Sequence, residues 1–188
     1  MHSKVRNKGT GSPLISYGYS AIDAVTDLII NNLTMDIAKV REIAEQQLAS
    51  TDMFVVECTC SPANEVELLI DSDTSVSIDT CVALNRAIDA EFDRDVEDFS
   101  LMVASAGIGS ELRVLRQYHK LTGKPVEVLL RNGVKLLATL DAADEESITL
   151  SYDEKVAVEG KKKKELQHVV KRYTMEEVKY TKEYLDYK

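Results

Sequence analysis

The chain has 188 residues and a formal net charge of −9, and this length suits one ordinary domain or two small ones. The acidity is concentrated in residues 35–106, which hold 4 Lys and Arg against 16 Asp and Glu, a balance of −12. A surface of this charge repels a phosphate backbone and attracts basic partners. Nonspecific nucleic-acid binding by this segment is therefore not expected.

Cysteine usage and hydropathy predict the compartment. The three cysteines are an odd number, and no secretory segment is recognisable. No apolar run approaches the roughly 20 residues that a membrane span needs. We therefore predict a cytoplasmic protein without a membrane partner.

The first 34 residues carry little pattern. Residues 1–20 are rich in Gly, Ser and small polar side chains, which predicts disorder, and residues 22–29 hold only a faint helical stripe. Met35 directly precedes the first strongly patterned helix. We therefore interpret residues 1–34 as a disordered or weakly helical extension, and favour an upstream start or a cloning artefact over a functional tail.

The segment 36–98 predicts a helix, a hairpin, a second helix and an acidic loop. Residues 36–49 space apolar side chains three and four apart, and two alternating segments, 53–60 and 65–71, follow around a Ser-Pro-Ala-Asn turn. Ser77 can cap a helix over 78–92. Residues 93–98 read as a solvated loop. The side chains predicted to face the core are Ile37, Val40, Ala44 and Leu48, then Phe54, Val56, Cys58 and Cys60, then Val66, Leu68 and Ile70, and finally Cys81, Leu84, Ile88 and Phe92.

Residues 99–125 join the two halves of the chain. Phe99, Leu101 and Val103 alternate with smaller or more polar residues, which predicts a strand that we expect to be central and buried. A glycine-flanked turn follows at Gly107–Gly109, and Ser110 can cap a helix over 111–121 that stops at Gly123.

The chain after Pro125 predicts five short strands. Two alternating segments flank Asn132-Gly133, a pair that favours tight hairpin turns, and a third strand spans 147–152. A polar loop with Lys161–Lys164 precedes a strand over 165–173. A helical turn at 175–179 and a possible fifth strand over 181–187 complete the chain.

These elements predict an α+β protein of two small domains. The N-terminal domain, residues 35–122, is an α/β sandwich-like unit with a three-stranded sheet covered by helices. The C-terminal domain, residues 123–188, suits an SH3-like or Sm-like β-barrel, whose closure would leave no long bare edge.

Thiol and histidine positions give little support for metal or redox chemistry. Cys58 and Cys60 share a strand face with apolar residues, and Cys81 lies on an apolar helix stripe, so core packing is the favoured interpretation. The three histidines, His2, His119 and His168, lack ligand spacing. We expect no metal and no cofactor.

Catalytic motifs are also weak. The turn at 105–109 lacks the Lys and Ser/Thr of a phosphate-binding loop and the full dinucleotide fingerprint. The acids of 91–98 could be paired catalytic carboxylates, although a solvated charge run is commoner. We therefore predict that the protein is not an enzyme and has no small-molecule substrate.

The strand, turn and helix of 99–123 resemble the signature of RimP, the bacterial ribosome maturation factor family. Members typically read as an apolar strand, Ser-Pro-Gly-Leu-Asp-Arg-Pro-Leu, and an aromatic-containing helix that ends near Gly. Ser105, Gly107 and Leu112 match this motif. The departures from it are Ala106 and Glu111 at the two prolines, and Gly109-Ser110 at the Asp-Arg pair. The order of elements fits the family over residues 35–188.

The resemblance implies a non-enzymatic assembly factor that binds the free small ribosomal subunit and assists its maturation. Read with the charge map, it suggests two contacts for a monomeric factor. Acids Asp93, Asp95, Glu97 and Asp98 could meet a basic ribosomal protein. Cations Lys161, Lys162, Lys163, Lys164, Lys171 and Arg172 could meet ribosomal RNA, unless the lysine run only solubilises a flexible loop.

Two other functions stay open. One is a general RNA-binding module built on the C-terminal barrel. The other is a small-molecule enzyme that uses the Gly107/Gly109 turn to hold an anion.

Overall fold

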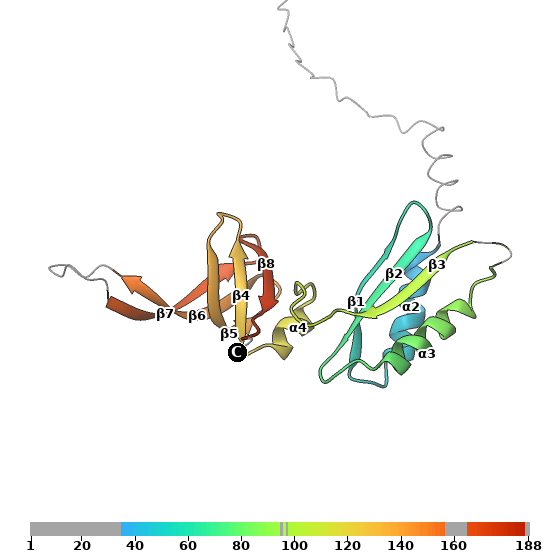
Figure 1. Ribbon diagram of the computed structural model, residues 1–188, viewed down its shortest axis with the longest axis horizontal. Helices are drawn as coiled ribbons and strands as arrows, with labels where there is room; N and C mark the ends of the chain where they lie inside the picture. The colour runs from blue at the N-terminus through green and yellow to red at the C-terminus, as the bar shows by residue number, and fades with distance from the viewer. Residues whose placement is uncertain (1–34, 95, 97, 157–164, 187–188) are drawn as a thin grey trace, which may run out of the picture. The chain divides into compact units, whose positions relative to one another are not determined.

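The computed structural model describes residues 35–94, 96, 98–156 and 165–186. The predicted extension 1–34, the acids Asp95 and Glu97, and the run Lys161–Lys164 lie outside these residues. The protein is mixed α+β, with one three-stranded sheet that carries helices and one five-stranded antiparallel sheet (Figure 1).

The N-terminal sheet has the strand order β1-β2-β3, built from β1 (Met53–Cys60), β2 (Glu65–Ser72) and β3 (Ser100–Ser105). β1 pairs antiparallel with β2, and β3 pairs parallel with β2 through a crossover that contains α3 (Ile78–Asp89). The helices α2 (Ile37–Leu48) and α3 cover one face, which we call the inner face. Its core lies around the fully buried β2 side chains Leu68 and Ile70.

Ser77 caps α3 as predicted, whereas Asp36, which we predicted as the first residue of its helix, is the N-cap of α2. The Asp36 side chain accepts a hydrogen bond from Lys39 N at 3.1 Å, and the Ser77 hydroxyl accepts one from Thr80 N at 3.1 Å. The predicted apolar stripes of both helices contribute to the core, except that Ile37 is half-buried and lies outside it. α3 ends at Asp89, before the predicted end at 92.

A β-bulge overturns the predicted face for the first half of β1, whereas Cys58 and Cys60 face the core as predicted. The register shifts between Val55 and Glu57, so the extra residue changes which side chains face inward. Val55 packs in the core together with Cys58 and Cys60, whereas Phe54 lies opposite Asp71 on the other face. A strict alternation through 53–60 cannot show such a shift, because the bulge depends on pairing with β2.

β3 is an edge strand and not the predicted central one. Leu101 and Val103 pack against the core but are only half-buried, and Met102 is 53% exposed. Asn85 Nδ2 donates to the Leu101 carbonyl at 3.0 Å, and an Arg94 guanidinium nitrogen donates to the Phe99 carbonyl at 3.0 Å. These side chains occupy acceptors that a bare strand edge would leave open.

The helix of the joint is shorter than predicted. α4 (Leu115–Lys120) has Val114 as its N-cap, so the helix does not begin after Ser110. The preceding residues pair with the last strand instead, because Leu112 N donates to the Thr181 carbonyl at 2.8 Å. The helix ends at Lys120 with Leu121 as its C-cap, before the predicted stop at Gly123, which has a φ of +80°.

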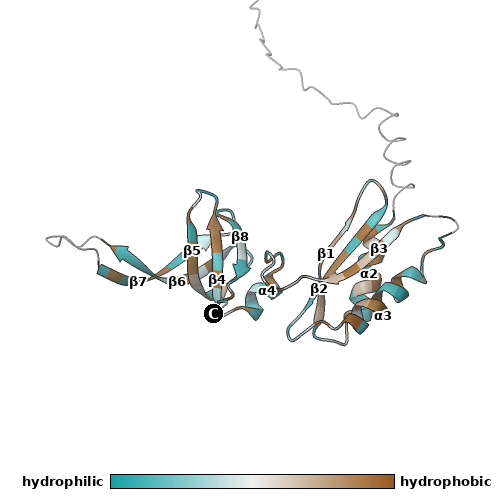
Figure 2. Cartoon of the chain, in the orientation of Figure 1, coloured by the Kyte–Doolittle hydropathy of each residue, from teal (hydrophilic) through white to brown (hydrophobic). Residues whose placement is uncertain are grey.

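The C-terminal sheet has the order β7-β6-β5-β4-β8 and is antiparallel throughout. Its strands are β4 (Pro125–Leu130), β5 (Lys135–Ala143), β6 (Ser147–Val156), β7 (Glu165–Thr174) and β8 (Val178–Glu183). Hydrophobic residues run along β4 and β5 in Figure 2, and Tyr118 and Leu121 pack into the same core as these strands.

Two expectations for this half are corrected. Residues 175–177 form a tight turn, with Glu177 N donating to the Thr174 carbonyl at 3.0 Å, where we predicted a helical turn, and β8 begins earlier than predicted. The sheet is also not closed into a barrel, because β7 and β8 stand at its two ends. Pairing of β6 with β7 continues to Val156, past Ser151, where pairing with β5 stops. The outer half of this hairpin is therefore a two-stranded ribbon.

Candidate functional site

The motif residues of the joint lie where the chain leaves the first sheet. Ser105 ends β3, and the following turn has Gly107 at φ +66° and Gly109 at φ +77°, which confirms the predicted glycine turn. A Cβ at Gly107 would lie 3.2 Å from Ser110 Oγ. Leu112 packs against the C-terminal core. The motif therefore begins at the end of β3 and ends at a residue that hydrogen-bonds to β8.

Asp71, at the end of β2, receives two side chains from α4. Lys120 Nζ lies 2.9 Å from Asp71 Oδ1, and Gln117 Nε2 donates to Oδ2 at 3.0 Å. Burial opposes ionisation of Asp71, but the hydrogen bonds from Lys120 and Gln117 outweigh it and hold the pKa of this carboxyl below its usual value. This contact joins α4 to the first sheet.

Two arginines extend the same contact. Arg116 binds the carboxylate of Asp73 with two nitrogens, at 2.6 and 3.2 Å, and lies 4.5 Å from the centroid of the Phe54 ring. Arg113 forms an ion pair with Glu57. We call Arg113, Arg116, Gln117 and Lys120, with the acids Glu57, Asp71 and Asp73, the joint clamp.

Sequence reasoning missed the joint clamp. The available signal was the spacing of Arg113, Arg116 and Lys120, which are three and four residues apart and follow a strongly acidic segment. Which acids they meet depends on the fold, because the bulge in β1 and the pairing with β2 set where Glu57 and Asp71 lie, and Asp73 follows directly after β2.

A cavity of about 290 Å³ lies beside the joint clamp. Gly107 and Gly109 line it, but so do the carboxyl-bearing residues Asp71 and Glu183, and its cation Lys120 is engaged by Asp71. Acidic walls disfavour an anion. The geometry therefore gives no support to the small-molecule enzyme that the turn alone could suggest.

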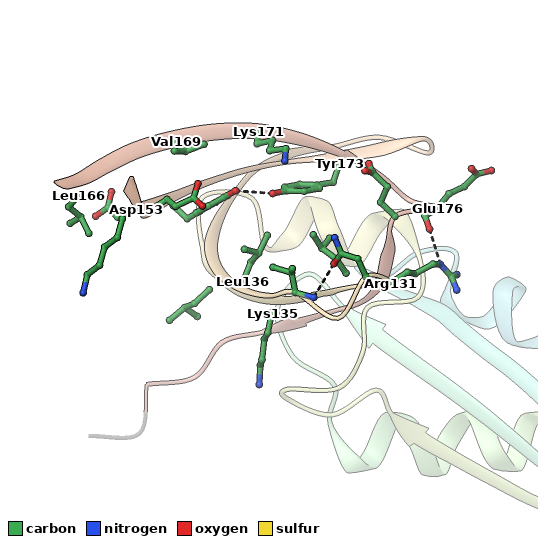
Figure 3. Close-up of a pocket in the computed structure, with 17 residues that line it drawn as sticks. Arg131, Lys135, Leu136, Asp153, Leu166, Val169, Lys171, Tyr173 and Glu176 are labelled. Atoms are coloured by element: carbon green, nitrogen blue, oxygen red, sulfur yellow. Dashed lines mark hydrogen bonds between the residues drawn. The ribbon is translucent and has the colours of Figure 1, made fainter. Parts of the chain in front are cut away.

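A larger groove, of about 1000 Å³, lies in the C-terminal half. Figure 3 shows Lys171 and Tyr173 on one side of it and Lys135 and Leu136 on the other. Lys171 Nζ lies 4.9 Å from the centroid of the Tyr173 ring. The Tyr173 hydroxyl is 2.8 Å from that of Tyr152, and burial together with this hydrogen bond raises the pKa of Tyr152 to about 12.

The two predicted RNA-contacting cations of β7 do not converge. Successive residues of a strand point to opposite faces, so Arg172 points away from the groove that Lys171 lines. Arg172 donates to Ser147 Oγ at 2.6 Å and to Asp144 Oδ2 at 2.9 Å. Hydrogen bonds from the backbone of Glu146 and from Ser147 lower the pKa of Asp144. Arg172 therefore has an acidic partner within the same sheet.

The predicted acidic contact is described only in part. Asp93 and Asp98 are exposed, while the other two acids lie outside the described residues. The loop is anchored at Arg94, which pairs with Asp89 at 2.5 Å and lies 4.4 Å from the centroid of the Phe99 ring.

The cysteines pack as predicted. Cys58, Cys60 and Cys81 all contact the N-terminal core, and burial raises the pKa of Cys58 to about 11. This favours the neutral thiol over a nucleophilic thiolate. Within the described residues, no cluster of three or more His, Cys, Asp or Glu is arranged to hold a metal ion, and no helix has the length and apolar character to cross a membrane.

Comparison with known proteins identifies the family. A family model described as the RimP N-terminal domain matches residues 36–109. The chain is 37% identical over 130 residues to the ribosome maturation factor RimP of Porphyromonas gingivalis, covering 69% of this chain and 86% of that protein. The chain belongs to the RimP family.

Two further relatives named ribosome maturation factor RimP agree with this. The protein of Christiangramia forsetii is 36% identical, and that of Flavobacterium psychrophilum 31% identical, each over 115 residues that cover 61% of this chain and 74% of the relative. The RimP resemblance predicted from Ser105, Gly107 and Leu112 is therefore confirmed.

Proposed function

We propose that this RimP-family protein is a cytoplasmic, non-enzymatic maturation factor that binds the free small ribosomal subunit and assists its assembly. The observation that carries the proposal is the relationship to ribosome maturation factors over most of their length, 86% in the P. gingivalis protein. The excess of acids in residues 35–106 supports reversible, salt-sensitive docking on basic ribosomal protein.

The proposal assigns the two halves different partners. The N-terminal domain, 35–122, meets a basic ribosomal protein. The C-terminal domain, 123–188, which we propose to be an SH3-like unit, meets ribosomal RNA with Lys171 and the Lys161–Lys164 run. Lys171, exposed on the groove, supports this, since a cation there suits contact with phosphates. The factor acts as a monomer.

Sucrose-gradient sedimentation of a lysate tests the proposal. We expect the protein to be enriched with free small subunits and depleted from assembled ribosomes and polysomes. Equal occupancy of free and assembled subunits would contradict a maturation role.

Loss of the gene provides a second test. We expect slow growth and accumulation of immature small-subunit RNA, most evident under fast growth. Normal precursor levels in the deletion strain would count against the proposal.

A general RNA-binding module is the second candidate, favoured by the exposed Lys171 on the C-terminal groove. Filter binding to unrelated RNA and to purified small subunits separates the two functions. Comparable affinities favour the general module, whereas a strong preference for the subunit favours the maturation factor.

A further inference from the structure

The outer face of the N-terminal sheet lies opposite α2 and α3. One end of this face contacts cationic side chains of the same chain, and the other end is exposed. Cross-strand partners share a face, so the register defines its rows. Phe54 and Asp71 form one row, and Glu57, Leu69 and Ala104 form the next. Thr59, Glu67 and Met102 make a third row, and Glu65 with Ser100 makes the last.

The first two rows are occupied by the chain's own cations. Arg116 stacks on Phe54, Lys120 pairs with Asp71, and Arg113 pairs with Glu57. At this end the face binds cationic side chains by combining carboxylates with an aromatic surface. The joint clamp is therefore an internal example of the chemistry that the face accepts.

The last two rows are open. Thr59, Glu65, Glu67, Ser100 and Met102 are all exposed. Within the described part of the chain, neither Glu65 nor Glu67 has an ion pair, and Glu65 accepts a hydrogen bond from the Ser61 hydroxyl at 3.2 Å. A groove of about 440 Å³ runs over these rows, with Met102 as an exposed apolar residue beside Glu67. We call these five residues the open end.

We propose that the open end docks an extended cationic segment of a partner protein. Glu65 and Glu67 stand two residues apart on β2, about 6.7 Å along the strand, and an extended peptide repeats its side chains on one side at the same interval. Lys or Arg at alternate positions of such a segment therefore matches both carboxylates. Met102 offers an apolar contact beside them.

Charge selects this occupant over others. The segment 35–106 has a balance of −12, which repels nucleic acid and opposes face-to-face pairing of two copies of the chain. The inference rests on the proposed function, because it supplies the surface by which the acidic half would meet a basic ribosomal protein. It moves that contact from the predicted loop at 93–98 to the sheet.

Peptide binding tests the open end. The probe is a fluorescently labelled Arg-Leu-Arg-Gly-Arg-Leu-Arg-Gly peptide, titrated with the full chain and followed by anisotropy. We expect Glu65→Lys with Glu67→Lys to weaken binding about tenfold or more, and Met102→Ser to weaken it about threefold.

The matched control reverses two acids on the helical side of the same domain. Glu42 and Glu45 are exposed on α2, and Glu42→Lys with Glu45→Lys makes the same change in net charge. Equal loss in both double variants would show nonspecific ionic attraction and overturn the proposal. Failure of the parent to bind the peptide would also overturn it, as would a concentration-dependent dimer that Met102→Ser abolishes, because the occupant would then be a second copy.

Co-sedimentation with purified small subunits separates this inference from the proposed function. If the parent and the Glu65/Glu67 variant co-sediment equally, the docking inference fails and the maturation role stands. If the parent binds the peptide through the open end but does not co-sediment with subunits, the proposed function fails and the docking surface stands. Circular dichroism melts confirm that each variant is folded.

Discussion

The two halves of the molecule differ in the balance and in the pairing of their charged side chains. Beyond the joint clamp, cations of the C-terminal half pair with acids of the same half, as Arg172 does with Asp144 and Lys135 with Glu127, at 2.9 and 2.8 Å. Residues 107–188 hold 16 Lys and Arg against 14 Asp and Glu. Residues 35–106 have four times as many acids as bases, and three of these acids are neutralised by the joint clamp.

This difference shows that the net charge of a segment does not tell how many of its charged side chains are free to bind a partner. A nearly neutral half still contains cations, but Arg172 is already committed to a neighbouring carboxylate, whereas Lys171 lines the groove. The acidic half keeps carboxylates exposed at its open end. Long-range attraction to a basic partner should therefore come mainly from the N-terminal half.

The largest expected effect concerns the core of that half. Leu68 is fully buried on the central strand, so Leu68→Ala should lower the free energy of unfolding by about 3–4 kcal/mol. Because Leu101 is only half-buried on the edge strand, Leu101→Ala should lower the free energy of unfolding by only about 1–2 kcal/mol. Urea unfolding monitored by circular dichroism measures both. Equal losses would contradict the edge position of β3.

The next effect concerns the turn that joins the halves. Gly107→Val places a branched side chain at a φ of +66°, which should cost about 1–3 kcal/mol. Gly107 also faces Ser110 Oγ, whereas a Cβ at Gly133, φ +87°, would meet open space. Gly133→Val is therefore the control for backbone strain alone. A larger loss at Gly133 would contradict the close packing of the joint.

The joint clamp should give the protein an acid-sensitive contribution to stability. The pKa of Asp71 in the folded state lies below its ordinary value of 3.8, so this stabilisation is complete above that pH. It is lost as the pH falls through the lower folded-state pKa. Asp71→Asn should remove this pH dependence and cost about 1 kcal/mol at neutral pH.

Lys120→Met sharpens the acid prediction. Without the Lys120 cation, burial of Asp71 is opposed only by its remaining hydrogen bonds, so the pKa of this carboxyl should rise. Because the folded-state pKa then approaches or exceeds the ordinary value of 3.8, thermal melts across acidic pH should show a smaller acid-dependent loss of stability than in the parent. An unchanged profile would show that the clamp does not act on Asp71.

The smallest expected effect is the difference between Lys171 and Arg172 in their contribution to binding the small subunit. If the groove meets RNA, Lys171→Ala should weaken binding to the small subunit about threefold and flatten its salt dependence. Arg172→Ala should change affinity less, because its guanidinium is already bound to Asp144 and Ser147. Replacing Lys161–Lys164 with Ala should flatten the salt dependence further. Unchanged slopes in all three variants would place the RNA contact elsewhere.

Much of the fold could be predicted because its signals are local. The cap at Ser77 and the Asn132-Gly133 hairpin follow from short-range chemistry, and the structure contains both. The family likewise follows from Ser105, Gly107 and Leu112. Of the predicted partner residues, Asp95, Glu97 and Lys161–Lys164 lie outside the described residues.

The sequence by itself determined the helices, most strands, the glycine turn and the sign of charge in each half, because spacing, capping and composition act within a few residues. Only the tertiary structure decided the bulge in β1, the edge position of β3, the start of α4 and the open C-terminal sheet. Each of these depends on which distant segment supplies a backbone or side-chain partner, as when Thr181 accepts from Leu112 N. The joint clamp and the open end belong to this second group, because pairing between strands places their carboxylates on one face.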